Sequence, residues 1–565
     1  MNALFILIIA IIAFLFGYRF YAKLLALAVF RLQSEYSTPA HSQADDHHYA
    51  AADAPVLFGH HVAALSVVAS ITGGILALMW GWIPAFLWLV VATTVAGAVY
   101  GLGCLWMCVR TPMAPLHELA GRYIGPATSA VFWVTAAAVV LILNAASLYI
   151  CADLLASNPD ATVPFWLFVV IALVFGRYVR ARAGRLDWLV ASAVSLASAL
   201  LVIQIFSNAR LAFTGELNLE IRGQALLSLN ADIVWMAAIL TVGFFATRAS
   251  IWKFNRPHGF LTFLLLVLAL LAFCGGVLIE RPVLLAPEFN TAPDKPATLP
   301  WLFVTFGAGA IAGFHLMIIH AVTAKQLHRE SDARLIGYGG TLLNAMVALS
   351  AVIIAGTTFG AAQPWNEFFA SWKGLQNLRP LFQLYIDGFS GFVSAIGLDA
   401  AFARTAVTVL VMSLLSTGLE AGLRVQYLLF EEVRDRFQIR VPGGKRFALW
   451  LTIGLTAVAA MWHSQTHGGI GYWPYFGAAN LILATFGFVL VALTLRHFGY
   501  PTIYALVPAG VTSALAAWAI LSMLARWWEQ NQWLSFVLGL VSSVALAIVL
   551  WEILRLYLSP PSPPR

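Results

Sequence analysis

The segment that decides the fold reads Thr305-Phe306-Gly307-Ala308-Gly309-Ala310-Ile311-Ala312-Gly313-Phe314-His315. It lies inside the apolar run 301–322, which is long enough to cross a bilayer as a helix, since about 20 apolar residues span the hydrocarbon core. Glycines at this density within a span are typical either of close helix packing or of a helix that is interrupted inside the membrane. An interrupted helix frees backbone groups that a ligand, an ion or water must satisfy, so we expect function to centre here.

The composition of the whole chain points to a membrane protein. Of its 565 residues, 61% are hydrophobic and 10% are charged, whereas soluble domains carry about 25% charged residues. This balance excludes an ordinary soluble enzyme, and the aromatic content of 13% excludes a disordered chain. The net charge of +7 is spread thinly over the sequence, so it indicates membrane topology rather than nucleic-acid binding.

Apolar runs of about the required length predict an all-α polytopic integral membrane protein with about 15 transmembrane helices. The expected spans are 2–18, 58–80, 82–109, 124–153, 162–177, 186–206, 231–248, 259–280, 301–322, 335–356, 401–423, 447–462, 473–495, 501–525 and 533–554. The first run lacks a small-residue cleavage site and is interpreted as a retained span. We expect residues 1–558 to form a single transmembrane domain and the Pro-rich residues 559–565 to form a short cytoplasmic tail.

The basic residues predict the orientation of the chain. With the N-terminus outside, about three quarters of the 32 Lys and Arg residues fall on the cytoplasmic side, as the positive-inside rule requires. Reversing the topology would invert this bias. We therefore expect a multi-pass membrane protein with the N-terminus outside and the C-terminus in the cytoplasm.

The expected span 58–80 has the same kind of interruption as the span 301–322. It enters with Phe58-Gly59-His60-His61 and continues through Ser70-Ile71-Thr72-Gly73-Gly74 near mid-membrane. Because both spans also carry histidine, we favour discontinuous helices that line a cavity over simple close packing.

Several uncommon strings, in order along most of the chain, resemble the carbon starvation protein A (CstA) family of membrane transporters. The matching strings are Gly17-Tyr18-Arg19-Phe20-Tyr21, Val56-Leu57-Phe58-Gly59-His60-His61 with Ala63-Ala64, Gly309-Ala310-Ile311-Ala312-Gly313-Phe314-His315, Asp332-Ala333-Arg334 followed by Ile336-Gly337-Tyr338-Gly339, and Trp473-Pro474 with Phe476-Gly477 and Asn480.

The resemblance implies a secondary active transporter, not an enzyme, that carries a small organic anion such as pyruvate or short peptides and is linked to the carbon-starvation response. It also implies a core like that of the amino-acid/polyamine/cation superfamily, with inverted repeats and a site near the membrane midplane. The sequence contains no nucleotide-binding loop, nucleophile motif or tight metal signature, so we expect no cofactor, and uphill transport would use an H+ or Na+ gradient. The expected partners are a small-molecule substrate and the lipid bilayer, without nucleic acid.

The candidate substrate and ion cavity is drawn from the two interrupted spans and from positions that match the family's motifs. Its expected residues are His60, His61, Ser70, Thr72, Gly73, Gly74, Gly307, Gly309, Gly313, His315, Thr323, Asn344 and Asn480. Adjacent helix residues point about 100° apart, so at most one of His60 and His61 faces a given cavity. We prefer His315 as the proton carrier, since histidine titrates near neutral pH. Half-helix N-termini at Gly73–Gly74 or Gly307–Gly309 could bind an anionic substrate.

The chain departs from the family pattern at several membrane-embedded positions. An acidic position of the family is Asn344 here, and because asparagine cannot titrate, we expect weak coupling to the ion that the acid serves in relatives. A motif with an acid and an arginine survives in outline as Glu420 and Arg424, for which we prefer a simple i,i+4 pair.

Two other classes of function remain open. The loss of embedded acids fits a transporter-derived subunit or nutrient sensor that no longer moves substrate. A membrane redox protein is the other alternative. Its haem ligands would come from among His60, His61, His315 and His320. We interpret the polar clusters Asp45–His48 and His463 with His467 as structural, because neither supplies a clear set of metal ligands.

Overall fold

The computed structural model describes a bundle of helices. It describes the whole chain except residues 46, 66, 112–113, 182–184, 208–216, 222–223, 230, 293–294, 373–374, 376, 437, 439–443, 466–472, 530, 532 and 559–565. The predicted Pro-rich tail and His467 therefore lie outside the described residues.

The helices follow one another with short connections. The first group comprises α1 (Ala3–Phe16), α2 (Ala22–Leu24), α3 (Pro39–Ser42), α4 (Ala54–Ala64), α5 (Val67–Ala77), α6 (Trp82–Ala92), α7 (Ala98–Arg110), α8 (Leu116–Tyr123), α9 (Pro126–Ser157), α10 (Pro159–Ala181), α11 (Arg185–Phe206), α12 (Ala231–Arg248) and α13 (Asn255–Glu280). The second comprises α14 (Thr298–Ala310), α15 (Gly313–Ile318), α16 (Gly340–Thr357), α17 (Ala362–Phe368), α18 (Leu378–Ser394), α19 (Ala400–Arg436), α20 (Lys445–Gln465), α21 (Trp473–His497), α22 (Ile503–Glu529) and α23 (Trp533–Leu558). Turns of π-helix join or extend several of these, at Gly17–Tyr21, Leu25–Val29, Thr93–Gly97, Ile319–Thr323 and Arg334–Gly339.

The predicted membrane spans all fall on helices. Among the described residues, 11 helices are long and apolar enough to cross a membrane, and the bent pair of α4 and α5 raises this number to 12. The remaining predicted spans fall on shorter apolar helices, Thr298–Gly307, Arg446–Trp462 and Phe536–Trp551. The protein is a helical, multi-pass membrane protein, as its composition predicts.

Apolar side chains cover the outside of the bundle. Large hydrophobic residues on α1, α11, α22 and α23 are more than half exposed, among them Leu15, Leu201, Leu521 and Trp551. Water would disfavour so large an apolar surface, whereas lipid tails favour it. We therefore interpret these faces as the surface in contact with the bilayer.

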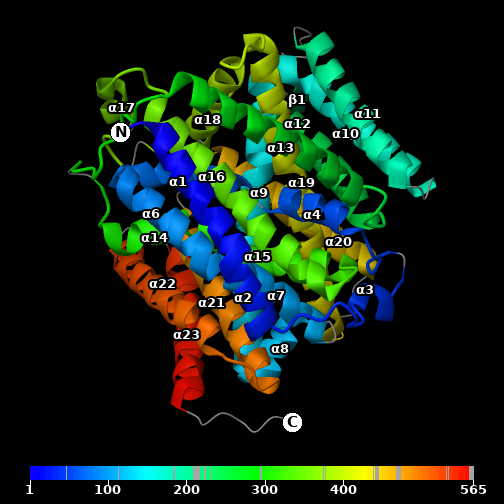
Figure 1. The fold of residues 1–565 in the computed structure, drawn as a ribbon, viewed down its shortest axis with the longest axis vertical. Helices are drawn as coiled ribbons and strands as arrows, with labels where there is room; N and C mark the ends of the chain where they lie inside the picture. The colour runs from blue at the N-terminus through cyan, green and yellow to red at the C-terminus, as the bar shows by residue number, and fades with distance from the viewer. Residues whose placement is uncertain are drawn as a thin grey trace.

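The centre of the bundle is formed by α16, α19 and α21. The most apolar stretch of α21 is entirely buried, and that of α19 is 94% buried. One continuous cluster of buried apolar side chains extends from Ala3 to Val549. The helix α1 starts in the upper left part of Figure 1 and α23 ends at the bottom, so the two ends of the helical chain lie far apart along the long axis of the molecule.

A short β-hairpin between α11 and α12 departs from the helical pattern. Its strands β1 (Leu217–Ile221) and β2 (Gln224–Leu229) pair antiparallel, with an irregular register between Leu219 and Glu220. Sequence analysis placed this segment between two spans without assigning strands to it. A hairpin satisfies its own backbone hydrogen bonds across one ladder, which suits a connection between spans.

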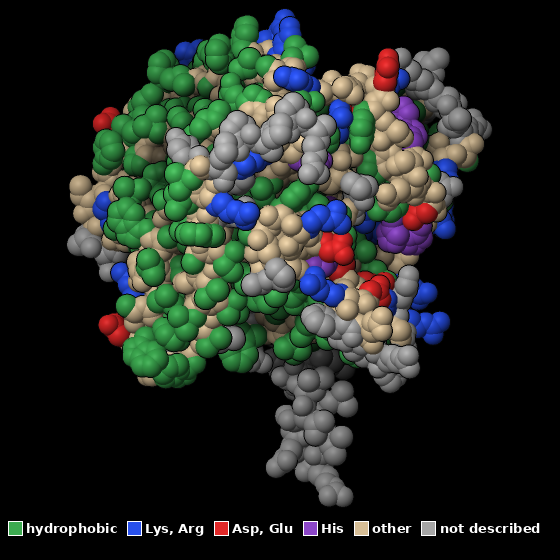
Figure 2. All heavy atoms as spheres, turned by 90° about the horizontal axis from the view of Figure 1, so that it is seen from below, with side chains coloured by type: hydrophobic (Ala, Val, Ile, Leu, Met, Phe, Trp, Pro, Cys, Tyr) green, Lys and Arg blue, Asp and Glu red, His purple; other side chains and the backbone are tan. Residues whose placement is uncertain are grey.

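Charged side chains are unevenly distributed over the lower end of the molecule. Seen from below, Lys, Arg, acidic and histidine side chains gather over one part of the surface, while hydrophobic side chains cover much of the remainder (Figure 2). Loops at an aqueous face and helices at a lipid face would produce this division.

Candidate functional site

The span that contains the opening segment is interrupted, as the sequence predicts. The helix α14 ends at Ala310, and α15 begins at Gly313. Between them Ile311 (φ −140°, ψ 96°) and Ala312 (φ −107°, ψ 121°) are extended. A turn of π-helix, Ile319–Thr323, follows α15 directly, and such turns are frequent at functional sites. The backbone is therefore irregular on both sides of His315.

The second interrupted span breaks earlier than we expect from its glycines. The helices α4 and α5 meet at an angle of 56°, and Leu65, just after α4, is extended (φ −67°, ψ 128°). Gly73 and Gly74 lie inside α5, where they allow other helices to approach. A Cβ on Gly73 would lie 2.9 Å from the carbonyl oxygen of Thr305, and one on Gly74 would lie 2.7 Å from that of Ala348. These two glycines serve helix packing, while the break belongs to Leu65.

The predicted positions of the half-helix N-termini also need correction. Gly73–Gly74 is inside α5, and Gly307–Gly309 is in the last turn of α14, so neither presents free N–H groups of a helix start. The half-helix after the break begins at Gly313. The side-chain oxygen of Asn480, on α21, accepts a hydrogen bond of 3.0 Å from the backbone N–H of Phe314.

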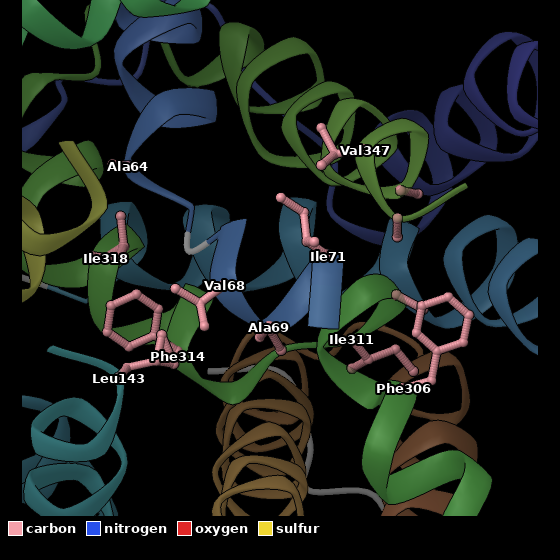
Figure 3. Close-up of a cluster of buried hydrophobic side chains, with 14 of the residues drawn as sticks. Ala64, Val68, Ala69, Ile71, Leu143, Phe306, Ile311, Phe314, Ile318 and Val347 are labelled. Carbon is pink, nitrogen blue, oxygen red and sulfur yellow. The ribbon is translucent and has the colours of Figure 1, made fainter. Parts of the chain in front are cut away.

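The two interrupted spans cross each other around apolar side chains. Figure 3 shows Val68 and Ile71 of α5 beside side chains of the other span, among them Phe306, Ile311 and Phe314. All of these side chains are buried. In this conformation the crossing is closed by hydrocarbon, so a polar substrate would need the half-helices to separate before it could enter.

Polar side chains link the two spans at the edges of this apolar centre. His61 Nδ1 lies 2.9 Å from Thr323 Oγ1 and joins α4 to the π-helical turn after α15. Ser70 Oγ donates to Asn344 Oδ1 at 2.7 Å. The amide of Asn344 also donates to the carbonyl oxygen of Gly309 at 3.4 Å. Asn344 thus joins α16 to α5 and to the last turn of α14.

The neighbouring histidines His60 and His61 face different helices, as their helical spacing predicts. His61 is directed to Thr323, whereas the ring of His60 packs against Gly259 of α13, where a Cβ would lie 2.7 Å from His60 Nδ1. Among the described residues, neither ring nitrogen of His60 has a hydrogen-bond partner. The two histidines therefore belong to two different sides of α4.

The remaining predicted residues lie close to the break without forming a polar cavity. The side chain of His315 is 4% exposed, and its ring makes no hydrogen bond to the described residues. Thr72 Oγ1 is buried without a partner in the described part of the chain. The Gly307 position faces Leu481, at 3.1 Å from a Cβ. The structure thus holds His61, Ser70, Thr323, Asn344 and Asn480 by hydrogen bonds at the crossing, whereas His60 faces α13 and, like Thr72, has no side-chain hydrogen-bond partner in the described part of the chain.

A buried acid–histidine pair was missed by the sequence analysis. Glu420 Oε1 lies 2.9 Å from His258 Nδ1 and also accepts a hydrogen bond from Ser416 Oγ at 3.2 Å. The side chains of His258 and Glu420 are 0% and 3% exposed. The predicted i,i+4 pair of Glu420 with Arg424 is wrong, because the carboxylate of Glu420 pairs with His258. An acid inside a predicted span was the available signal, since such groups are costly in a membrane.

Arg424 uses its guanidinium group on a neighbouring connection. It donates to the carbonyl oxygens of Ala246 and Ala249, at 3.0 and 2.6 Å, and to Asn255 Oδ1 at 3.2 Å. These acceptors lie at the end of α12 and the start of α13. Arg424 therefore fixes this connection against α19, one helical turn beyond Glu420.

The described cavities lie away from the crossing. One of about 450 Å³ is lined mainly by the segment 50–56, by α10 and by the start of α13, and includes Arg180, Trp252 and Arg256. None of the sequence-predicted site residues lines it. A second, of about 440 Å³, includes Asp45, His48 and Arg248. Asp45 Oδ1 there accepts backbone N–H groups of His47, His48 and Tyr49 at 2.7–2.9 Å, which gives it a structural role in the turn.

Two other buried acids, Glu330 and Asp153, form ion pairs between distant parts of the chain. Glu330 receives two hydrogen bonds from Arg110, at 2.5 and 2.7 Å, and one from the backbone N–H of Gln33 at 2.7 Å. Asp153, near the end of α9, pairs with Arg379 of α18. Both pairs connect elements that are distant in sequence, so they restrain the bundle in the conformation described here.

Solved structures of other transporters show a low level of similarity to this chain. A Na+-coupled sialic acid symporter in a substrate-bound outward-open state is 12% identical, with a TM-score of 0.39 and coverage of 98% of both chains. A manganese transporter of Eremococcus coleocola, in complex with an aromatic bis-isothiourea substituted compound, is 12% identical, with a TM-score of 0.34 over 87% of this chain and 95% of that chain.

Named relatives are more similar in sequence. The peptide transporter CstA of Mycobacterium tuberculosis is 31% identical over 366 residues, or 63% of this chain and 46% of its own length. The pyruvate/proton symporter BtsT of Escherichia coli is 30% identical over 361 residues, or 63% of this chain and 49% of its own length. The chain thus spans about half the length of these two relatives. The peptide transporter CstA of Escherichia coli is 27% identical over 600 residues, or 94% of this chain and 81% of its own length.

The family to which these relatives point also matches the chain directly. The model of the family described as carbon starvation protein CstA matches residues 2–364. This range contains both interrupted spans, the π-helical turn after His315 and Asn344. The chain belongs to the carbon starvation protein CstA family.

Proposed function

We propose that this protein is a secondary transporter that moves a small organic anion of the pyruvate type, or short peptides, across the bacterial inner membrane. The observation that carries the proposal is the crossing of two interrupted spans, tied together by His61–Thr323 and Ser70–Asn344. Breaks in both spans allow each half-helix to move without unwinding a continuous helix. The named relatives, a peptide transporter and a pyruvate/proton symporter, support this choice of substrates.

The apolar crossing gives the proposed transport cycle a closed state. Phe306, Ile311 and Phe314 fill the space between the spans (Figure 3). Separation of the half-helices would open a cavity edged by the hydroxyls of Ser70, Thr72 and Thr323, which can bind a carboxylate or a peptide group. Opening and closing of such a crossing on alternate sides is the basis of alternating access.

We also propose the orientation that the basic residues predict, with the N-terminus outside and the C-terminus in the cytoplasm. A role in the response to carbon starvation is proposed from the family alone. Both proposals can be tested separately from transport, by accessibility of introduced cysteines to a membrane-impermeant reagent and by growth of a deletion strain on peptides or pyruvate.

Transport itself is tested with purified protein in lipid vesicles. Labelled pyruvate and labelled di- and tripeptides are offered with and without an imposed proton gradient, and counterflow exchange is measured in parallel. We expect counterflow of at least one of these substrates. Vesicles that hold correctly folded protein but exchange none of them would contradict the proposal.

A transporter-derived subunit or nutrient sensor is the second candidate function. The specific observation in its favour is the dense apolar packing of the crossing, together with Asn344 in place of an embedded acid. A sensor would bind substrate without exchange and would copurify with a partner in a fixed ratio. Binding of labelled pyruvate or peptide without counterflow, together with such a partner, would select this alternative.

A further inference from the structure

The buried pair His258–Glu420 is not explained by the crossing described above. It lies between α13 and α19, with a distance of 2.9 Å between His258 Nδ1 and Glu420 Oε1. Both side chains are shut off from solvent. Burying two ionisable groups costs free energy that a well-packed apolar pair would not cost. Ionisable residues inside a membrane are rare because they are costly, so such a pair indicates a functional site.

We propose that the His258–Glu420 pair is the site at which this protein binds and releases its coupling proton, an inference that rests on the transport function proposed above. In the loaded state the pair holds two protons, one in the hydrogen bond between Nδ1 and Oε1 and one on His258 Nε2 or Glu420 Oε2, and it is neutral overall. Release of the second proton leaves a neutral imidazole that donates from Nδ1 to the Glu420 carboxylate, so the pair then carries a single negative charge. Binding and release thus move one proton and one charge, and no other reactant takes part.

Two unused atoms of the pair provide places for the proton to arrive and leave. Glu420 Oε2 and His258 Nε2 are buried, and neither has a hydrogen-bond partner among the described residues. Most buried polar atoms in proteins are paired, so an unpaired atom on each partner needs an explanation. Proton exchange at these atoms explains why they are left unpaired, because each can carry a proton without breaking the hydrogen bond between Nδ1 and Oε1.

The surroundings can compensate the charge of the deprotonated pair. Cys151 on α9 and Arg424 on α19 interact electrostatically with Glu420. The neighbouring His60 on α4 interacts with His61, with Arg256 on α13 and with Arg424. The ring of Phe168, on α10, lies 6.2 Å from the ring of His258. The charges of Arg424 and Glu420 interact along α19, so Arg424 can compensate the negative charge that remains after the proton leaves.

A cavity lies near the pair, on the side of Arg424. The cavity of about 440 Å³ that contains Asp45 and His48 lies next to Arg424, whose Nη1 is 3.5 Å from His48 Nδ1. Arg424 is one helical turn from Glu420. The positive-inside rule assigns the basic residues of this cavity, such as Arg248, to the cytoplasmic side, which is where an imported proton must leave.

The pair is also connected to the interrupted span. Thr417, one turn before Glu420 on α19, donates to the carbonyl oxygen of Ala63 at 2.9 Å. Ala63 lies near the end of α4, just before the break at Leu65. On the other side, α4 packs on α13, and His60 contacts Gly259, the neighbour of His258. A change in the His258–Glu420 bond therefore acts on α13 and α19, the two helices that hold α4. If the pair binds the proton more tightly when α4 is in one of two positions, proton binding shifts the equilibrium of α4 towards that position.

Infrared spectroscopy of the purified protein tests proton binding without any substrate. Spectra of wild type and of Glu420→Gln are compared as the pH is changed between acid and neutral values. We expect a protonated-carboxyl signal that titrates in the wild type, disappears in Glu420→Gln and moves in His258→Gln. Glu431→Gln, an acid on the same helix that pairs with Arg434, is the matched control and should leave the signal unchanged.

Transport in vesicles tests whether this proton is the coupled one. The readout is the ratio of proton-driven accumulation to counterflow exchange for labelled pyruvate or peptide. We expect Glu420→Gln to lower this ratio about tenfold or more, within the usual range of coupling between two sites, while Glu431→Gln keeps the wild-type ratio. If Glu420→Gln does not fold, His258→Gln provides the same comparison, because glutamine can still donate to the acid.

The two proposals fail in different ways. Wild-type protein without counterflow of any substrate contradicts the proposed transport function, and the infrared comparison then still decides whether Glu420 binds a proton. The inference is overturned if the wild type shows counterflow and proton-driven accumulation, and if Glu420→Gln and His258→Gln keep the wild-type ratio of accumulation to counterflow. A titrating carboxyl signal that survives in Glu420→Gln also overturns it.

Discussion

The side-chain oxygen of Asn480 accepts a hydrogen bond of 3.0 Å from the backbone N–H of Phe314. Phe314 is the second residue of α15, the half-helix that starts after the break, and Asn480 belongs to the buried helix α21. Helix N-termini are usually capped by a residue just before the helix, and here Ala312 cannot serve. The cap is supplied from another helix, so the start of the half-helix is tied to the centre of the bundle.

Loss of this cap should weaken the protein. Asn480→Leu leaves the Phe314 N–H unpaired and should reduce stability by about 0.5–2 kcal/mol, the usual cost of removing a cap. Asn480→Asp keeps an acceptor oxygen at a position where a negative charge suits a helix start, so it should retain more of the stability. The melting temperatures of both variants in detergent check this order, and a Leu variant as stable as wild type would contradict the capping role.

The glycines of the opening segment should differ in their tolerance of alanine. At Gly313 a Cβ would lie 2.7 Å from the backbone nitrogen of Ala484, and backbone atoms of the buried α21 cannot easily move aside. At Gly309 the Cβ would meet the ring of Phe306 at 2.7 Å, which can rotate. We expect Gly313→Ala to lose folding or transport, at a cost of about 1–3 kcal/mol or more from overpacking, and Gly309→Ala to be milder.

The control for these substitutions is Gly510→Ala. Apart from the nearby backbone of its own helix and its chain neighbours, no described residue has an atom within 4 Å of the Cβ position at Gly510, and alanine is the better helix former. Expression level, melting temperature and counterflow of the three variants are compared. Equal behaviour of Gly313→Ala and Gly510→Ala would show that the close approach of α21 is not needed.

The interruptions could be predicted from the sequence, but their positions only in part. In the second interrupted span the glycines at Gly73 and Gly74 mark close helix contacts, while the break falls at Leu65, a residue with no local preference for ending a helix. The neighbours that surround α4 decide where it ends, and they come from distant parts of the chain. Glycine serves both purposes, so its presence alone cannot distinguish them.

The polar contacts between helices were beyond sequence reasoning for a similar reason. His258 and Glu420 are 162 residues apart in the chain, and their pairing depends on how α13 and α19 pack. The different directions of His60 and His61, in contrast, follow from helical geometry alone and were predicted. Local geometry is set by the sequence near a residue, whereas partners are set by the packing of the whole bundle.

The acid stability of the protein should depend on His48, which lies in the loop before α4. Burial, followed by the charges of Arg424 and Lys325, lowers the pKa of His48 to about 3, whereas an unfolded histidine has a pKa of about 6.5. Between these values the unfolded chain binds a proton that the folded protein does not bind. The contribution of His48 is therefore present above about pH 6.5 and is lost as the pH falls towards 3.

The variant His48→Gln removes this titration and should make the melting temperature in detergent less sensitive to pH between neutrality and mild acid. His41→Gln, which changes an exposed histidine on the short helix α3 before this loop, is the control and should keep the slope of the wild type. If the wild type and His48→Gln lose stability in parallel as the pH falls, His48 is not the residue responsible.

Asn344 provides the last prediction, because it holds three elements with one side chain. Its oxygen accepts a hydrogen bond from Ser70 and its amide donates to the carbonyl of Gly309. Asn344→Asp keeps the acceptor, but an ionised carboxylate has no proton to donate, and its charge would face the Gly309 carbonyl in an apolar setting. We expect a lower melting temperature at neutral pH for Asn344→Asp than for Asn344→Ser, which retains a donor. The sequence alone predicts weak ion coupling because Asn344 replaces an acid. The proposed His258–Glu420 site leads us to expect instead that proton-driven accumulation in the wild type survives without an acid at this position. Accumulation that becomes proton-dependent only in Asn344→Asp would show instead that position 344 controls coupling, and would reverse the roles proposed for the two sites.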